Sequence, residues 1–443
     1  MLQRTHRLKA PPCGNSLSAV GETSDVVCDG PNVVMVKPVG PVCNLRCEYC
    51  YYVDKTTMFP VGERYRMTNE VLETTIRSFL EASSGPSVHF VWHGGEPTLA
   101  GIDFYRRALE LQRRYLPSGW ECRNSIQTNG TLIDDRWARF IAENEIGVGL
   151  SLDGPPAIHD RGRPDRHRRG SHARAVRGFA TLREHGVDSD VLCTVNARTA
   201  AAPRGVYRYF VNLGVRWLQF IPVVRRVGED ADEISVRPDA YGAFLTTIFD
   251  EWVRYDVEHL TIQEFMIPML VAMGRPPQLC VASATCGQVL AVEHDGGIYS
   301  CDHFVDPAHH LGDVRGHGVL AAFTSPAQRA FGAAKAEVPS ACAECDVLVF
   351  CRGGCPKDRF GPAAASTNYL CEGYREFYRH ALPYVTRMAT LALTGRRPSS
   401  IAAELAVAER ESRRMFREAG RNHLCPCGSG RKYKQCCYRT RRR

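Results

Sequence analysis

The feature that most constrains this chain is a compact group of three cysteines, Cys43, Cys47 and Cys50, with the spacing C-x3-C-x2-C. Three thiolates can ligate only three irons of a [4Fe–4S] cube, because complete ligation of that cluster by protein takes four. The fourth iron would stay open to a small molecule. A zinc knuckle or a disulfide fragment is the simpler interpretation of a cysteine trio. However, no second cysteine pair that could complete a zinc site follows within about thirty residues.

With Tyr49 directly before the third cysteine, this segment resembles the cluster motif of the radical S-adenosylmethionine superfamily. In that superfamily the open iron binds S-adenosylmethionine, and the cluster cleaves it reductively to start radical chemistry. The resemblance implies a [4Fe–4S] cluster on the three cysteines and S-adenosylmethionine as the second cofactor.

Short apolar runs alternate with amphipathic stretches from Val33 to about Val224, a pattern typical of repeated βα units around a parallel sheet. A helix is expected over Thr68–Ala82, and another around Trp137, opened by Thr131-x-x-Asp134. Six units predict an α/β fold with a partial (β/α)6 barrel. The expected strands are Val33–Lys37, Val88–Trp92, Cys122–Gln127, Gly147–Leu152, Val191–Val195 and Val215–Ile221.

Functional groups of parallel barrels collect at the C-terminal ends of strands, and the motifs here follow that rule. The cysteine loop follows the first expected strand, His93-Gly94-Gly95-Glu96-Pro97 the second, Gln127 the third and Ser151 the fourth. By the resemblance, Gly94, Gly95 and Glu96 bind the cofactor, with the glycines at its methionine amino group, and Ser151 faces its ribose.

Three further residues are assigned to the cofactor by the same resemblance. Tyr49 matches an aromatic residue that packs near the adenine, although the residue type alone fits a core tyrosine equally well. Arg163 matches an arginine that pairs with the methionine carboxylate, a role that suits guanidinium geometry. Val224, after the sixth strand, is expected to form an apolar wall for the adenine.

A second cysteine-rich region contains eight cysteines between Cys280 and Cys371, enough for two fully ligated [4Fe–4S] clusters. The count alone does not exclude two structural zinc sites. The order of spacings resembles the SPASM domain, which follows the barrel in peptide-modifying radical enzymes. The resemblance implies a first auxiliary cluster on Cys280, Cys286, Cys301 and Cys355, and a second on Cys342, Cys345, Cys351 and Cys371.

Asp302 follows directly after one of these cysteines, in Cys301-Asp302-His303-Phe304-Val305. An exposed aspartate in a turn is the simpler interpretation. A carboxylate fixed beside a cluster ligand could instead accept a proton while a substrate radical is oxidised. Together with Trp92–Pro97 and the eight cysteines, the stretch resembles the anaerobic sulfatase-maturating enzymes, and the resemblance covers about residues 33–385.

That resemblance implies a substrate, a reaction and a set of roles. The family converts a Cys or Ser of a sulfatase polypeptide to Cα-formylglycine without oxygen, with Asp302 as the base and Tyr52 and Gln127 lining the peptide site. A ferredoxin or flavodoxin is the expected electron donor. The alternatives are another SPASM enzyme that crosslinks a precursor peptide through thioether or carbon–carbon bonds, and a non-catalytic metal-binding scaffold.

The end of the chain carries two cysteine pairs joined by a Gly-rich turn, Cys425, Cys427, Cys436 and Cys437. Four thiolates at this spacing predict one closed tetrahedral zinc site, which has no open position for chemistry. The segment resembles the SEC-C motif. Its basic neighbours, Arg431, Lys432, Lys434, Arg439 and Arg441–Arg443, suit an acidic partner such as a ribosome or secretion-machinery surface.

Composition bounds the location and organisation of the 443-residue chain. There is no run of eighteen apolar residues, which predicts no membrane span, and nineteen cysteines without an export signal indicate a reducing cytoplasm. The net charge of +8, concentrated in 161–169 and 439–443, permits nucleic-acid binding without requiring it. We expect a loose leader (1–30), the barrel (31–238), bridging helices with the SPASM domain (239–393), a helical linker (394–420) and the SEC-C segment with its basic tail (421–443).

Overall fold

The computed structural model describes residues 30–438 apart from 61, 229 and 361–366. The leader expected over 1–30 therefore lies outside the described residues except for Gly30. The basic residues Arg439 and Arg441–Arg443 also lie outside them.

Six parallel strands form the centre of the fold and lie side by side in chain order. The six expected strands are confirmed, with ends that shift by one or two residues. Their burial alternates along each strand because successive side chains point to opposite faces of the sheet. The strands are β1 (Val33–Val36), β2 (Ser87–Trp92), β3 (Glu121–Thr128), β4 (Gly147–Ser151), β5 (Asp190–Val195) and β6 (Trp217–Pro222).

The sheet continues beyond these six strands at both edges, reaching ten strands across the described residues. β9 (Thr261–Ile262) pairs with β6 in a stretch that the sequence predicted as helices alone. At the other edge, β10 (Val289–Val292) pairs in parallel with β1, and β11 (Gly297–Tyr299) and β12 (His310–Asp313) follow as antiparallel strands. The cysteine-rich region thus extends the barrel sheet, and β10 brings it beside the loop that carries Cys43. β7 (Arg226–Val227) and β8 (Asp230–Ala231) form a separate hairpin.

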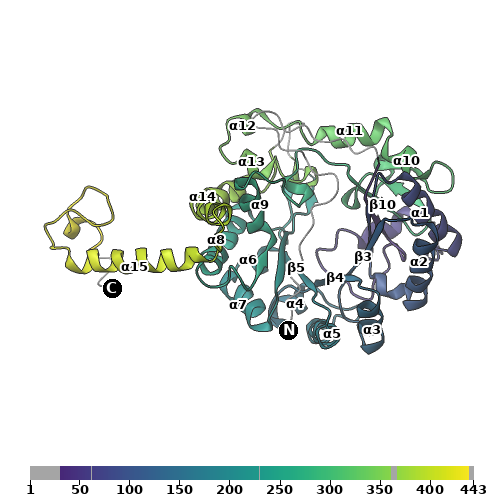
Figure 1. The fold of residues 1–443 in the computed structure, drawn as a ribbon, viewed down its shortest axis with the longest axis horizontal. Coiled ribbons are helices and arrows are strands. Elements are labelled where there is room, and N and C mark those ends of the chain that lie inside the picture. Colours follow the sequence, from purple (N-terminus) through teal and green to yellow (C-terminus); the bar gives the residue numbers. More distant parts are fainter. Residues whose placement is uncertain (1–29, 61, 229, 361–366, 439–443) are drawn as a thin grey trace.

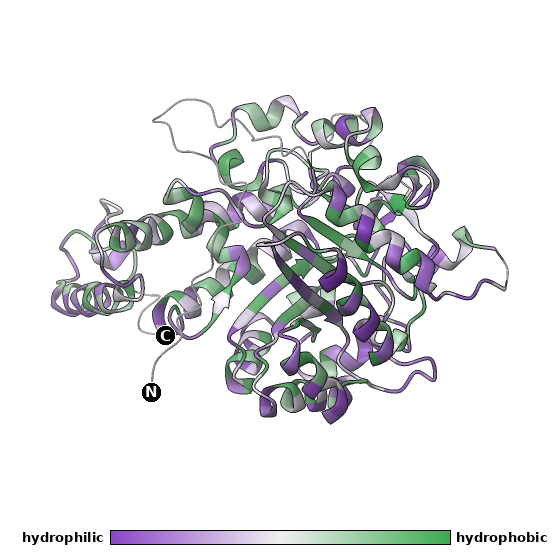
Figure 2. Cartoon of the chain, turned by 45° about the vertical axis from the view of Figure 1, so that its right-hand side comes forward, coloured by the Kyte–Doolittle hydropathy of each residue, from purple (hydrophilic) through white to green (hydrophobic). Residues whose placement is uncertain are grey.

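Helices surround this sheet (Figure 1), and both the strands and the helices carry hydrophobic and hydrophilic residues (Figure 2). The buried hydrophobic residues of the strands and of the helices form one core. Phe79 of α1 packs edge-on against Phe90 of β2 with ring centroids 4.8 Å apart, which ties a helix to the central sheet. Along the barrel the helices are α1 (Asn69–Ala82), α2 (Ile102–Tyr115), α3 (Asp135–Glu143), α4 (Pro156–Gly162), α5 (His172–Glu184), α6 (Ala197–Ala200) and α7 (Pro203–Leu213). Beyond it are α8 (Pro238–Tyr255), α9 (Gln263–Ala272), α10 (Gly318–Phe323), α11 (Pro326–Ala334), α12 (Ser340–Ala343) and α13 (Leu348–Cys351).

Two helix starts show how local sequence sets these boundaries. Thr68 caps α1 by accepting a hydrogen bond from the Val71 amide. α3 is capped by Asp134, which accepts from the Trp137 amide, so the expected opening at Thr131 was three residues too early. Thr131 instead accepts a hydrogen bond from Asn44 Nδ2 at 2.8 Å and thereby supports the cysteine loop.

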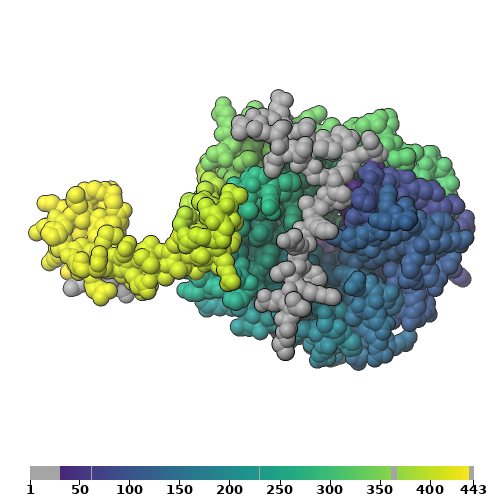
Figure 3. Space-filling model, viewed as in Figure 1, coloured from purple at the N-terminus to yellow at the C-terminus, as the bar shows by residue number. Residues whose placement is uncertain are grey.

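Two further helices complete the described chain, α14 (Cys371–Leu393) and α15 (Ser400–Glu418). α15 lies against the body at its start, where Ile401 is buried, and then extends away from it to carry the SEC-C segment (Figures 1 and 3). α15 is therefore buried only near its start, and Met415 is 50% exposed.

Candidate functional site

The cysteine loop after β1 is held by the arginine-rich segment around residues 162–169. Backbone hydrogen bonds join Arg46 to Pro164 at 2.8 Å and Glu48 to Gly162 at 3.0 Å. Arg166 donates from Nε and Nη2 to the Cys43 carbonyl, at 3.0 and 2.6 Å. From the sequence, the arginines of this segment were compatible with nucleic-acid binding. The structure shows that one of them, Arg166, holds the backbone at Cys43.

All three cysteines of the loop are partly buried. Burial raises the pKa of Cys43 to about 11 and that of Cys47 to about 12, because a thiolate loses solvation away from water. A bound cation is what stabilises thiolates in such surroundings. Three cysteine sulfurs in one loop are the donor set that an iron–sulfur cluster with one open iron requires.

Glu96 ties the end of β2 to the end of β3. Its carboxylate accepts hydrogen bonds from Thr98, from Thr128 at 2.8 Å and from the Asn129 amide at 2.8 Å. The Asn129 side chain in turn donates to Cys43 Sγ at 3.7 Å. Burial raises the pKa of Glu96, which is 1% exposed. This carboxylate is engaged by protein groups and acts on the cysteine loop through Asn129, so the structure gives it a positioning role.

Gly94 and Gly95 are required by the close approach of the segment that leads into Cys43. A Cβ on Gly95 would lie 2.0 Å from the Val42 carbonyl oxygen. Gly94 has a φ of +123°, and a Cβ there would lie 2.9 Å from the Gly40 carbonyl oxygen. The glycine pair therefore fixes the backbone of the cysteine loop against β2.

Ser151 and Gln127 lie together at the ends of neighbouring strands. Gln127 Nε2 donates to Ser151 Oγ at 3.2 Å. The space above Gly149 is filled by the Gln127 side chain, since a Cβ there would lie 2.1 Å from Gln127 Oε1. The structure thus brings one expected cofactor residue and one expected peptide residue to the same rim of the barrel.

Tyr49 and Arg163 meet at a buried carboxylate that the sequence analysis did not select, Asp153. Arg163 donates from Nε and Nη2 to the two oxygens of Asp153, at 2.8 and 3.1 Å. The Tyr49 hydroxyl also donates to Asp153, and its ring lies 5.4 Å from the guanidinium carbon. Although burial opposes ionisation, Arg163 keeps the pKa of Asp153 below its usual value. Two donors of Arg163 are thus engaged by protein, which competes with the expected pairing to a ligand carboxylate.

Tyr52 is buried in the protein, and Val224 is partly buried against the core. Tyr52 is 2% exposed, and the Lys37 ammonium lies 3.6 Å from the centroid of its ring. Its neighbour Tyr51 is 42% exposed. Val224 is half-buried and packs against the core just after β6.

Asp302 lies at the junction of the barrel and the cysteine-rich region. The fully buried Lys37, directly after β1, pairs with Asp302 Oδ1, and the Tyr51 hydroxyl donates to Oδ2. Burial favours the neutral acid, but Lys37, with His93 and His303 nearby, holds the pKa of Asp302 well below its usual range. The carboxylate is therefore ionised and fixed between the radical-cluster loop and Cys301.

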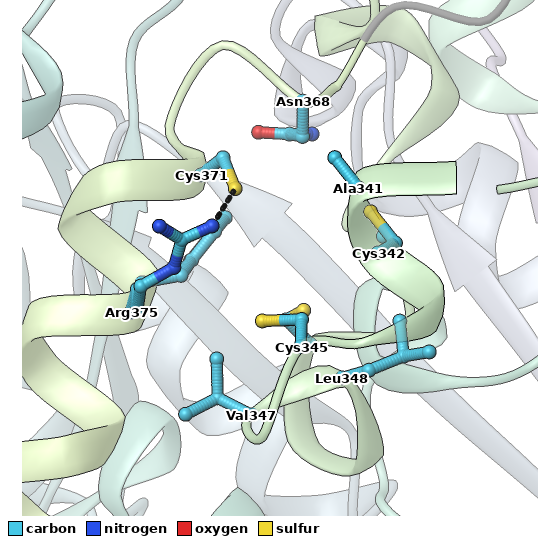
Figure 4. Close-up of a pocket in the computed structure, with 11 residues that line it drawn as sticks. Ala341, Cys342, Cys345, Val347, Leu348, Asn368, Cys371 and Arg375 are labelled. Carbon is cyan, nitrogen blue, oxygen red and sulfur yellow. Dashed lines mark hydrogen bonds between the residues drawn. The ribbon is translucent and has the colours of Figure 1, made fainter. Parts of the chain in front are cut away.

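The eight cysteines of the second region gather at two places. Cys342, Cys345, Cys351 and Cys371 line one pocket between α12, α13 and the start of α14 (Figure 4). Cys280 lies within electrostatic range of Cys286, Cys301 and Cys355. The fully buried Lys335 binds the Cys280 turn, donating to the carbonyls of Cys280, Val281 (3.1 Å) and Ser283 (2.5 Å).

The four cysteines of the C-terminal segment are packed more closely than the others. Their sulfurs all lie within 4.8 Å of one another, with Cys427 to Cys436 at 3.5 Å and Cys436 to Cys437 at 3.7 Å. Four thiolates about 2.3 Å from a tetrahedral zinc stand about 3.8 Å apart. Among the described residues, the other cysteines form no group this close, as suits the larger [4Fe–4S] cube. Geometry thus separates one zinc-type site from the cluster-type sites.

Comparisons with known proteins agree with this division. The Radical SAM superfamily profile matches residues 38–199, the SPASM profile, described as an iron-sulfur cluster-binding domain, matches 284–346, and the SEC-C motif matches 421–439. The serine-type anaerobic sulfatase-maturating enzyme of Bacteroides thetaiotaomicron is 38% identical over 391 residues, 84% of this chain and 94% of that protein. This chain belongs to the anaerobic sulfatase-maturating enzymes.

Two further relatives support the assignment to the anaerobic sulfatase-maturating enzymes. The cysteine-type enzyme of Clostridium perfringens is 32% identical over 365 residues, 81% of this chain and 98% of that protein. The solved structure of native anSMEcpe with bound AdoMet superposes with a TM-score of 0.75 at 32% identity, covering 81% of this chain and 99% of that one. These relatives do not favour the crosslinking alternative.

The chain is a radical S-adenosylmethionine enzyme whose cofactors are [4Fe–4S] clusters and S-adenosylmethionine, and its last four cysteines fit a zinc site. In the described part of the chain, no helix is both long and apolar enough to cross a membrane.

Sequence reasoning missed Lys37, Tyr51, Asp153 and Asn129. A lysine directly after an apolar strand is the one signal that could have drawn attention to Lys37. Asp153 lies two residues after Ser151 and could have been selected from the same strand end.

Proposed function

We propose that this enzyme oxidises a Cys or Ser side chain of a sulfatase polypeptide to Cα-formylglycine without oxygen. The observation that carries the proposal is the position of Asp302, which Lys37 and Tyr51 fix between the radical-cluster loop and a ligand of the first auxiliary cluster. The solved structure of native anSMEcpe with bound AdoMet and Cp18Cys peptide supports a peptide substrate.

The bound cofactors supply a 5′-deoxyadenosyl radical that removes one Cβ hydrogen atom and a cluster that accepts one electron. The chain itself must remove the remaining proton from the substrate oxygen or sulfur, and Asp302 is placed to take it. An O–H or S–H on a carbon radical is far more acidic than in the parent side chain, so an ionised carboxylate of low pKa suffices. Serine then gives the aldehyde directly, while cysteine gives a thioaldehyde that water hydrolyses.

The remaining residues hold the reactants. We assign Gly94, Gly95 and Ser151 to the cofactor, with Tyr49 and Val224 near its adenine. Glu96 and Arg163 take part in the same site by positioning Asn129 and Asp153. Gln127, bonded to Ser151, and the exposed Tyr51 face the peptide side, and the buried Tyr52 packs against Tyr51.

The direct test uses the anaerobically reconstituted full chain with S-adenosylmethionine, a reductant and matched sulfatase peptides containing Cys or Ser. Mass spectrometry should show formylglycine in at least one peptide, together with 5′-deoxyadenosine. Cofactor cleavage without any modified peptide would reject the proposed substrate class. A peptide with Ala at the target position controls for uncoupled cleavage.

Lys37 provides a test of the junction. Lys37→Met leaves Asp302 without its buried counter-ion, and losing one partner of a buried pair costs about 3–5 kcal/mol. We expect a lower free energy of unfolding and at least a tenfold lower formylglycine yield. Both are measurable by denaturant unfolding and mass spectrometry. Lys55→Met is the control, because Lys55 lies near Asp302 but forms no hydrogen bond or ion pair with it. Equal losses in both variants would indicate a general charge effect, and an unchanged Lys37→Met would remove Lys37 from the site.

We propose that the SEC-C segment recruits the substrate in the cytoplasm, through a ribosome or secretion-machinery surface, before the sulfatase folds. Its zinc-type site is closed, and Arg431, Lys432 and Lys434 are exposed around it at the end of α15 (Figure 3). A ferredoxin or flavodoxin supplies the electrons. The division into barrel (31–238), SPASM region (239–393), linker (394–420) and SEC-C segment (421–443) is part of the same proposal.

Deleting residues 421–443 should separate recruitment from chemistry. Because the segment extends from the body, activity on short peptides should stay within about twofold, while maturation of full-length sulfatase in cells should fall several-fold. The purified truncated chain should also lose one zinc per chain. A loss of peptide activity would instead show that the segment supports the catalytic body.

A further inference from the structure

Arg375 directs its guanidinium at a cysteine of the second auxiliary-cluster pocket (Figure 4). It lies one helical turn after Cys371 at the start of α14, and its Nη2 donates to Cys371 Sγ at 3.9 Å. Its Nε is buried and has no hydrogen-bond partner among the described residues. A buried cationic donor with this capacity left over is unusual, because buried polar groups are normally paired.

Arg375 forms no ion pair with a carboxylate in the described part of the chain. The nearby acid, Asp346, is taken by Arg379, which donates three hydrogen bonds of 2.9–3.3 Å to it at the surface. The positive charge of Arg375 is therefore directed into the pocket. The same pocket receives the N-terminus of the 23-residue helix α14, whose dipole adds positive potential at Cys371.

The first auxiliary site uses its buried cation differently. Lys335 directs its ammonium at three backbone carbonyls of the turn that begins at Cys280. These hydrogen bonds hold the turn in place. They use the N–H donors of Lys335 on carbonyl oxygens and not on a cysteine sulfur. Among the residues that the structure describes, the guanidinium–sulfur hydrogen bond is thus found at the second site.

We propose that Arg375 raises the reduction potential of the second auxiliary cluster by donating to Cys371 and by placing a positive charge beside the cluster. The reduced cluster carries one more negative charge than the oxidised one, so a nearby cation stabilises it more. Hydrogen bonds to ligand sulfurs act in the same direction. Arg375 is thereby a tuning residue of the second site. The proposal rests on the assignment of this cluster to Cys342, Cys345, Cys351 and Cys371.

The test uses the full chain with Cys43, Cys47 and Cys50 replaced by Ala, so that only the auxiliary clusters remain after anaerobic reconstitution. Arg375→Met removes the charge, Arg375→Lys keeps it without the planar donors, and Arg379→Met is the matched control one turn away. Redox titration followed by electron paramagnetic resonance gives the two midpoint potentials. An iron count reports whether both clusters are present.

We expect Arg375→Met to change the reduced-to-oxidised ratio of one cluster at least tenfold at fixed potential, a shift of about 59 mV to more negative values. The other cluster should not shift, Arg375→Lys should fall between, and Arg379→Met should match the parent.

Two unchanged potentials, equal shifts of both, or an equal effect of Arg379→Met would overturn the proposal. Loss of about four irons in both Arg375 variants would also overturn it and assign Arg375 to cluster assembly. If only Arg375→Met loses iron, the Arg375→Lys variant decides. An unchanged midpoint potential in Arg375→Lys overturns the proposal, and a more negative potential supports it. An iron count of about eight in the parent separates this test from a failure of the cluster assignment.

Discussion

Replacing Cys43, Cys47 and Cys50 together with Ala should abolish 5′-deoxyadenosine formation altogether. Without these thiolates no cluster can present an open iron to S-adenosylmethionine, and the remaining ligand groups are complete sets of four. The auxiliary cysteines come from other elements, around β11, α12, α13 and α14, so their clusters should assemble independently. The iron content should fall by about four atoms per chain, with about eight retained.

A control removes the same number of thiols elsewhere. Replacing Cys425, Cys427 and Cys436 with Ala should remove one zinc and leave the iron content and the cleavage of S-adenosylmethionine unchanged, since those sulfurs form a separate close group. Deoxyadenosine is measured by chromatography under strong reductant. Retained cleavage in the Cys43, Cys47 and Cys50 variant would refute the assignment of the radical cluster.

The strand-end rule explains why much of the site could be predicted from the sequence. Parallel strands bring their C-terminal ends to one rim, so motifs far apart in the chain, such as Gly94–Gly95 and Ser151, were expected near the cysteine loop. The structure places Gly95 against Val42, just before Cys43. It also places Gln127 on Ser151. Local patterns sufficed there because chain order and spatial order coincide.

The pairings between distant segments could not be predicted in the same way. β9 has two residues and β11 three, too few for a periodic pattern, so nothing local indicated that the sheet continues past the barrel. The pairing of β10 with β1 is what brings Asp302 to Lys37, 265 residues earlier in the chain. Likewise, the motif position of Arg163 did not reveal that Asp153 already engages two of its donors.

The junction formed by Lys37, Tyr51 and Asp302 joins the two halves of the proposed reaction. Tyr51 follows Cys50 of the radical-cluster loop, and Asp302 follows Cys301 of the first auxiliary site. A substrate radical formed at this point would have a carboxylate and an electron acceptor on the same side. Hydrogen-atom removal and proton removal thus depend on different residues, and the two steps can be separated by mutation.

Asp302→Asn should therefore continue to cleave S-adenosylmethionine while formylglycine yield falls by about 10²–10⁴-fold, the usual contribution of a positioned base. The amide has nearly the same shape as the carboxylate but cannot take the proton. Asp306→Asn is the matched control. Asp306 accepts hydrogen bonds from the Ala308 and His309 amides, which an asparagine can also accept, and it does not contact Lys37.

The readout is the ratio of 5′-deoxyadenosine to formylglycine peptide, which should rise sharply in Asp302→Asn alone. Because Lys37 keeps the pKa of Asp302 well below its usual range, the carboxylate is already ionised at neutral pH. Raising the pH should not restore the yield of Asp302→Asn, because the asparagine side chain has no group that titrates. In deuterated buffer, a stalled substrate radical that takes one electron from the reductant and one deuteron from solvent would carry one deuterium at Cβ. That label would be direct evidence that hydrogen abstraction precedes the blocked proton step. Full turnover by Asp302→Asn would assign the base to another residue and leave Asp302 as the partner that holds Lys37 in place.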